Sequence, residues 1–75
     1  MIYRGVITGD LNKKIQPGIY TIQSGSTVQN APDGTGWSAF IQLPDVYQTQ
    51  IVYIQTKGVL HRKYAGSPAN WTTWI

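Results

Sequence analysis

Two tryptophans, Trp71 and Trp74, lie near the end of the chain, and Trp74 is the candidate for a binding chemistry, whereas Trp71 is expected in core or corner packing. A flat aromatic ring offers an apolar face on which the C–H groups of a sugar can stack. Two large aromatics on a fraying end would be exposed apolar surface, so we predict a pinned strand over residues 71–75. Side chains alternate along a strand, so one tryptophan is expected to enter the core. For Trp74 three surfaces stay open: a neighbouring subunit, a sugar, or this chain's own core.

A second aromatic, Tyr64, is like Trp74 in its position along the strand: the alternation of side chains points both rings to the face opposite that of their likely core neighbours. A sugar site needs one flat apolar face and a few fixed polar groups, and polar residues flank both rings in the expected loops and strands. Loops on a rigid β scaffold can vary without disturbing the core. The predicted carbohydrate-binding residues are therefore Asn30, Asp33, Arg62, Tyr64, Asn70 and Trp74.

Catalysis is not expected, because the three acidic residues Asp10, Asp33 and Asp45 all lie beside turn or capping signals. There the short aspartate side chain bonds the local backbone. A glycosidase needs two facing carboxylates, and only Asp33 with Asp45 could supply them. We therefore predict no enzyme activity, no catalytic residues and no cofactor.

The single histidine, His61, has no cysteine or carboxylate partner nearby in the sequence. A surface position on a strand is the ordinary interpretation. The alternative is a three-fold axis at which three copies of His61 meet a metal ion. The predicted metal-ligand set is none.

The composition favours an all-β domain. The 75 residues contain no cysteine and no glutamate, and 12% are charged. Uncharged polar, β-branched and aromatic residues suit strands and disfavour long helices. A chain this short buries a small core, and self-association is a common source of added stability. The net charge of +3 is spread along the chain, so no polyanion-binding face is expected.

The pattern of residues predicts a small antiparallel β-sheet or sandwich of about five strands with one short N-terminal helical turn. The turn is expected over 11–15, between Asp10 as a cap and Pro17-Gly18 as a stop. Lys57-Gly58 has the character of a tight hairpin. Residues 24–36 are expected to form a long loop. The predicted strands are 18–23, 37–43, 50–56, 59–65 and 71–75, the last three as a meander.

The strand over 37–43 has apolar residues of one parity, namely Trp37, Ala39, Ile41 and Leu43. That parity predicts a core-facing set. Together with the next strand, it places Trp37, Ile41, Val52 and Ile54 in the core.

Three sequence blocks occur in a recognisable order. The first is Asp10-Leu11-Asn12 followed by Pro17-Gly18-Ile19-Tyr20, and the second runs from Asn30-Ala31-Pro32 through glycines to Trp37. The third is Tyr64-Ala65-Gly66-Ser67 followed by Trp71-Thr72-Thr73-Trp74. In this order and spacing the chain resembles the knob domains at the tips of phage tail fibres and R-type pyocin fibres.

The resemblance implies a fibre-tip module without catalysis of its own. Residues 1–9 would be an N-terminal lead joining a fibre shaft, and residues 10–75 the knob domain. The implied partners are two further copies in a homotrimer, the rest of the tail fibre, and a bacterial surface polysaccharide or other glycan. The implied location is the virion tail, made in the host cytoplasm without a signal peptide and acting outside the cell. The knob would attach to the glycan and would cap and trimerise the fibre.

The alternative is an OB-like or cold-shock-like nucleic-acid-binding module, since such modules are also small, five-stranded and aromatic. Their aromatics cluster on adjacent strands among Lys and Arg, whereas the strands here carry Gln and Thr. We therefore expect no nucleic-acid partner. Residues 1–7 are too short and too interrupted for a signal peptide or a membrane span, so no membrane insertion is expected.

Overall fold

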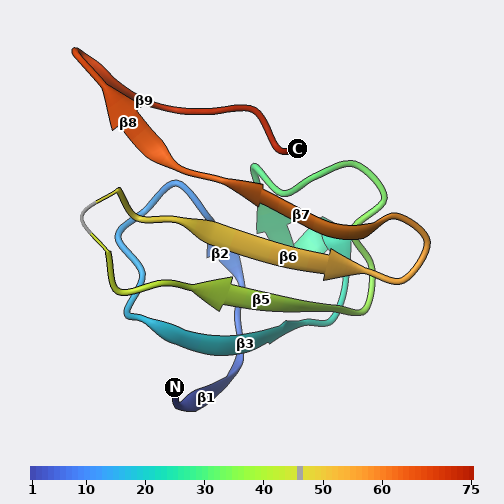
Figure 1. Cartoon of the computed structure of the whole chain (residues 1–75). Helices are drawn as coiled ribbons and strands as arrows, with labels where there is room; N and C mark the ends of the chain where they lie inside the picture. The colour runs from blue at the N-terminus through green and yellow to red at the C-terminus, as the bar shows by residue number, and fades with distance from the viewer. Residues whose placement is uncertain (46) are drawn as a thin grey trace.

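The computed structural model describes residues 1–45 and 47–75, and these contain strands and one short 3-10 helix (Figure 1). The all-β class predicted from composition is confirmed. The elements in chain order are β1 (Tyr3–Val6), β2 (Gly9–Asp10), β3 (Gly18–Ile22), η1 (Gly25–Thr27), β4 (Val28–Gln29), β5 (Ser38–Gln42), β6 (Gln50–Ile54), β7 (Gly58–Arg62), β8 (Tyr64–Gly66) and β9 (Ala69–Trp71).

The main sheet has five strands in the order β1-β3-β5-β6-β7. The pairs β3–β5, β5–β6 and β6–β7 are antiparallel, whereas β1 runs parallel to β3, so the sheet is mixed. The predicted Lys57-Gly58 hairpin is confirmed: it joins β6 to β7, and Gly58 has φ 83°. Two small pairs complete the fold, β2 with β4 and β8 with β9.

The predicted helical turn over 11–15 is wrong. Asp10 instead begins a tight turn, in which its carboxylate Oδ1 accepts from the Asn12 backbone N–H at 2.8 Å. The Asp10 carbonyl oxygen also accepts from the Lys13 backbone N–H at 3.2 Å. An aspartate that bonds its own backbone two residues on favours such a turn over the start of a helix. The only helical element among the described residues is η1, inside the segment 24–36 that was expected to be a loop.

The hydrophobic core lies on one face of the main sheet. Its members are Leu11, Tyr20, Ile22, Val28, Phe40, Val52 and Ile54. Leu11 follows β2 and Val28 lies in β4, the two strands that cover this face in Figure 1. The Tyr20 and Phe40 rings pack in a tilted arrangement with their centroids 5.8 Å apart. Because neighbouring strands contribute side chains of matched register, this one face holds a continuous core.

The predicted core parity of β5 is wrong, although that of β6 is confirmed. Val52 and Ile54 are buried as expected, but Trp37 is 73% exposed and Ile41 is only partly buried. The buried residues of β5 are Ser38, Phe40 and Gln42. This face is the buried one because it places Phe40 fully in the core, and the hydrogen bond that Gln42 accepts from buried Gln50 offsets part of the cost of burying a polar side chain.

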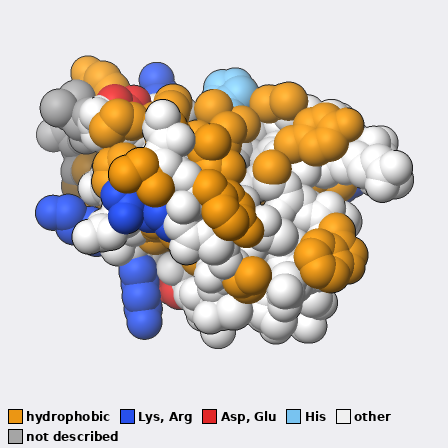
Figure 2. Space-filling model, turned by 90° about the horizontal axis from the view of Figure 1, so that it is seen from below, with side chains coloured by type: hydrophobic (Ala, Val, Ile, Leu, Met, Phe, Trp, Pro, Cys, Tyr) orange, Lys and Arg blue, Asp and Glu red, His pale blue; other side chains and the backbone are white. Residues whose placement is uncertain are grey.

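The opposite, outer face of the main sheet is apolar and uncharged. Two cross-strand rows form it, Ile19–Ile41–Ile51–His61 and Thr21–Ala39–Tyr53–Val59. Tyr53 and Val59 are 50% and 62% exposed, so this face is open to contact. Figure 2 looks at the molecule from its β1 and β3 side: hydrophobic side chains run across it, and Lys and Arg gather toward one end.

The C-terminal segment is held, though not as a strand over 71–75. Strand β9 ends at Trp71, and the chain then runs back along β7 (Figure 1). Ile75 exchanges two backbone hydrogen bonds with His61, of 2.8 and 3.0 Å. The Thr72 backbone N–H donates to the Lys63 carbonyl oxygen at 2.8 Å. The predicted meander of the last three strands is confirmed for β6 and β7. Strands β8 and β9 then form a separate ribbon, and the segment after β9 lies along β7 without forming a regular strand.

Candidate functional site

Arg62 lies between the two C-terminal tryptophans. Its side chain points to the core face of β7, where it is 5% exposed. The guanidinium carbon is 4.1 Å from the Trp71 ring centroid and 4.7 Å from that of Trp74. Both distances fall within the range of a cation–π contact. The chain therefore builds an aromatic stack, defined here as Trp71, Arg62 and Trp74, at the end of the main sheet.

In this single chain Trp74 packs against the core of its own chain, one of the three surfaces left open by the sequence. It is partly buried against the core, and its indole Nε1 donates to the Asn30 carbonyl oxygen at 2.9 Å. Asn30 takes the left-handed backbone conformation, with φ 65°, and its side-chain amide donates to the Asp10 carboxylate at 2.6 Å. Both tryptophans can face Arg62 because the chain leaves regular strand geometry after β9. The simple alternation of a straight strand does not hold there.

A network of buried hydrogen bonds holds the Arg62 side chain in place. Its Nε donates to Gln50 Oε1 at 2.8 Å, and Gln50 Nε2 donates to Gln42 Oε1 at 3.0 Å and to the Leu11 carbonyl at 2.7 Å. Among the described residues, Arg62 Nη2 is buried without a hydrogen-bond partner. Burial lowers the pKa of Arg62 to about 10, and the negative charge of Asp10 opposes that shift. The side chain remains cationic at neutral pH, with the two indole faces as its contacts.

A hollow of about 380 Å³ lies beside Trp74, and we call it the Trp74 hollow. Lys57, at the β6–β7 turn, donates through Nζ to the Asp33 carbonyl oxygen at 2.6 Å, which ties that turn to the 30–36 loop. The result is an indole held beside a carboxylate, an ammonium and a hydroxyl. Its lining is Ala31, Pro32, Asp33, Lys57, Leu60, Thr73 and Trp74.

A second hollow, of about 220 Å³, lies beside the other tryptophan, and we call it the Tyr64 hollow. Tyr64 and Trp71 are paired across β8 and β9, and their ring centroids are 5.3 Å apart. Asn12, Lys14 and Gln48 complete the lining. Gln48 has φ 51°, a conformation uncommon for a residue other than glycine and one that concentrates at functional sites.

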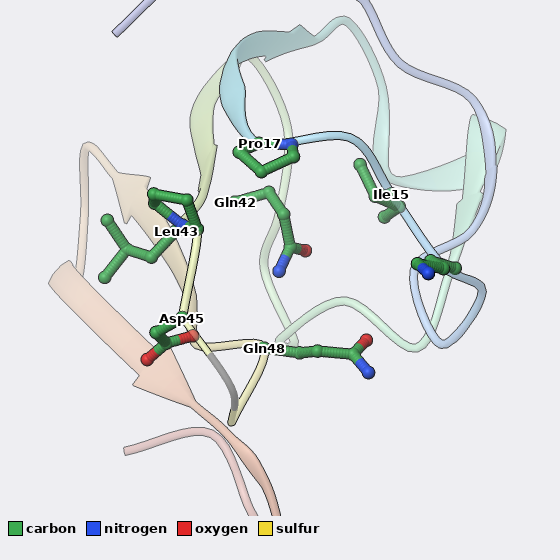
Figure 3. Close-up of a pocket in the computed structure, with 8 residues that line it drawn as sticks. Ile15, Pro17, Gln42, Leu43, Asp45 and Gln48 are labelled. Atoms are coloured by element: carbon green, nitrogen blue, oxygen red, sulfur yellow. The ribbon is translucent and has the colours of Figure 1, made fainter.

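A third hollow, of about 410 Å³, adjoins the Tyr64 hollow, because Lys14 and Gln48 line both. Figure 3 shows the Gln42 side chain reaching between Pro17, Ile15 and Gln48. We call it the Gln42 hollow. Its lining is Lys14, Ile15, Pro17, Gln42, Leu43, Pro44, Asp45 and Gln48. The two adjoining hollows therefore offer one groove with aromatic rings at one end and amides along it.

The six residues predicted from sequence do not form one cluster. Asp33 and Trp74 line the same hollow, and Asn30 supports Trp74 through its backbone. Tyr64 lines a different hollow, and Asn70 is exposed in β9, opposite Ala65.

The role expected for Arg62, a hydrogen-bonding group for a sugar, needs correction. Its guanidinium is buried under the aromatic rings and supports them rather than presenting donors at the surface.

Sequence reasoning missed several lining residues. Lys57, Leu60 and Thr73 line the Trp74 hollow, whereas Lys14 and Gln48 link the other two. Lys57 had a usable signal, since a residue at a predicted hairpin tip is free to meet a neighbouring loop. Lys14 and Gln48 had none, because they come from turns whose shape depends on long-range pairing.

The acidic residues have the local roles that were expected of Asp10 and Asp45. Asp45 accepts from the Thr49 backbone N–H at 2.8 Å and from its hydroxyl at 2.7 Å, and these bonds lower its pKa. The Asn12 N–H and the Asn30 amide likewise lower the pKa of Asp10. Asp33 and Asp45, the pair considered for glycoside hydrolysis, line separate hollows.

Two further findings concern metals and membranes. Over residues 1–45 and 47–75, no group of three or more His, Cys, Asp or Glu side chains is placed to hold a metal ion. His61 lies exposed in the outer row of the sheet. The same described residues include no helix with the length and apolarity to cross a membrane.

Comparisons with known proteins give no family assignment: no family model, curated protein or solved structure matches the chain.

Proposed function

We propose that this chain is an attachment module that binds a bacterial surface glycan, as the knob at the tip of a phage or phage-like tail fibre. The observation that carries the proposal is the aromatic stack. It holds two indole rings in fixed positions, each beside a hollow lined by charged and amide groups. One flat apolar face with a few fixed polar groups is the chemistry that sugar recognition requires.

Preorganisation supports this function. Trp74 is fixed by its bond to Asn30 and by Arg62, and Lys57 is tied to the 30–36 loop. Groups held in place by their neighbours lose little freedom on binding, which favours even a weak ligand. A single such site is expected to bind a sugar with a Kd on the order of millimolar. A useful attachment then needs several linked copies.

A homotrimer would supply these copies, with residues 1–9 leading into a fibre shaft. The outer face of the main sheet suits contact between copies of this chain. It is apolar in most of its eight positions and holds no Asp, Glu, Lys or Arg. Copies with a net charge of +3 each can therefore meet there without bringing like charges together. Exposed apolar patches of this kind mark interaction surfaces.

The proposal is tested by adsorption of fibre-bearing particles to host cells and by a glycan array probed with the assembled fibre. Asp33→Ala and Tyr64→Ala remove polar and aromatic groups from the two hollows without removing a tryptophan of the stack. Both should reduce adsorption. Tyr47→Ala is the matched control, because Tyr47 is an exposed tyrosine that lines none of the three hollows and lies outside the two rows of the outer face. Each variant is first checked by circular dichroism and light scattering.

If the assembled fibre binds no glycan, or if both hollow variants adsorb like the control, the module is a structural cap instead. Tight DNA binding that weakens steeply with salt would favour the nucleic-acid alternative.

A further inference from the structure

Gln42 is a largely buried residue whose side-chain amide lines a hollow. Gln42 is 3% exposed, and its Oε1 accepts from Gln50 Nε2 at 3.0 Å, which fixes which way the amide is turned. Its Nε2 has no hydrogen-bond partner among residues 1–45 and 47–75. A side-chain amide carries two N–H donors, and Gln42 Nε2 is not among the buried unpaired atoms, so its donors are accessible from the hollow. Figure 3 shows the side chain directed into the space between Pro17, Ile15 and Gln48. The hollow thus holds a place for an acceptor oxygen.

The charges around the groove favour an anionic acceptor. Lys14 lines both adjoining hollows, and its ammonium makes no hydrogen bond within the described part of the chain. The groove's carboxylate, Asp45, is already engaged, since each of its oxygens accepts a bond from Thr49. Donors therefore remain unused in the groove, and the Lys14 ammonium in its lining balances the charge that the hydrogen-bonded Asp45 carboxylate keeps. An oxyanion would complete the set with charge-assisted hydrogen bonds, which are stronger than neutral ones.

The rest of the groove has the surface of a sugar site. Pro17 and Ile15 offer apolar contact to a ring beside Gln42, and Tyr64 with Trp71 offers aromatic faces at the other end. We infer that the Gln42 hollow is a second sugar subsite that selects an acidic glycan, whose carboxylate accepts from Gln42 Nε2 and lies beside the Lys14 ammonium. The next sugar of the same chain then lies in the Tyr64 hollow. This inference rests on the proposed function and names its ligand class.

The test uses the full chain, labelled with ¹⁵N, and sodium glucuronate as the probe. Its methyl ester is the matched neutral control, and inorganic phosphate is a third arm that separates a sugar carboxylate from any small oxyanion. Two-dimensional NMR follows the side-chain amides of Gln42 and Gln48 during each titration. Lys14→Gln is the test variant. Lys13→Gln is its control, because it makes the same charge change one residue away and lines none of the three hollows.

We expect glucuronate to shift the Gln42 amide at millimolar concentration and the methyl ester to bind roughly tenfold more weakly. Lys14→Gln should weaken glucuronate binding by a similar factor, whereas Lys13→Gln should leave it unchanged. Equal binding of acid and ester, equal effects of the two lysine variants, or phosphate binding as tight as glucuronate would each overturn the inference. If the ester and neutral glycans still bind at Tyr64, only the acidic selectivity fails and the proposed function stands.

Discussion

Residues Phe40 and Ile41 are neighbours in β5 that point to opposite faces of the main sheet, and replacing each by alanine tests which face holds the core. Phe40 is fully buried, lies opposite Tyr20 and Val52 in register, and packs on the Tyr20 ring. Truncating such a phenylalanine costs about 3–5 kcal/mol of unfolding free energy. A chain of this length has a total stability of about 4–11 kcal/mol, so Phe40→Ala should leave a marginal or unfolded protein.

Ile41 is partly buried on the outer face. Full burial of an isoleucine is worth about 1.5–3 kcal/mol, so truncating a side chain that stays partly in water should cost about 1 kcal/mol. Urea unfolding followed by circular dichroism measures both variants. The comparison is made at several protein concentrations, because a cost of Ile41→Ala that grows with concentration belongs to self-association. If Ile41→Ala costs as much as Phe40→Ala in the monomer, the core lies on the other face and the fold described above is wrong.

Three further predictions concern the stack, the acidic turns and one close backbone approach. Arg62→Met should cost about 1–3 kcal/mol of unfolding free energy, because it keeps the packing of the side chain but leaves buried Gln50 Oε1 without its donor. Arg62→Ala should cost more, because it also removes that packing; urea unfolding compares the two variants. Asp10 and Asp45 have lowered pKa values in the folded state. Their contribution to the unfolding free energy is therefore complete above about pH 4 and is lost as pH falls through the folded pKa. In the double variant Asp10→Asn with Asp45→Asn, the unfolding free energy should fall less steeply with decreasing pH than in the parent. An equally steep fall would contradict the lowered pKa values of the two aspartates. Gly25→Ala should lower the melting temperature, because its new Cβ would collide with the carbonyl oxygen of Thr35, whereas Gly36→Ala meets open space and should not; equal melting of the two would refute the close approach.

Local patterns were sufficient to predict the all-β class, the β6–β7 hairpin and the buried parity of β6. Gly58 at a hairpin tip and the alternation of Val52 and Ile54 are short-range signals, and the structure confirms both. The face of β5 was not predictable in this way, because both of its faces carry apolar residues. The choice between them depends on Gln42 meeting Gln50 across the sheet, and that contact joins residues eight apart.

The candidate site was predicted only in part, because some of its contacts also depend on residues brought together by the fold. Aromatic and polar residues near the chain end were identified, and two of them, Asp33 and Trp74, do share a hollow. Arg62 was assigned the wrong exposure, since a charged residue on a strand is usually solvated. Only the folded chain brings two indoles onto the guanidinium, because the segment after β9 bends back along β7.

The pairing of the C-terminal segment with β7 makes the two edges of the main sheet unequal. On one edge, His61 and Lys63 already have backbone partners in Ile75 and Thr72, so an incoming strand finds those positions occupied. On the other edge, β1 is the last strand in the sheet order and has a neighbour on one side only. A further strand could therefore pair with this sheet along β1 only, and the irregular register of β1 between Tyr3 and Gly5 limits that pairing. A domain built this way resists edge-to-edge pairing of sheets through β7, whereas β1 remains an edge strand.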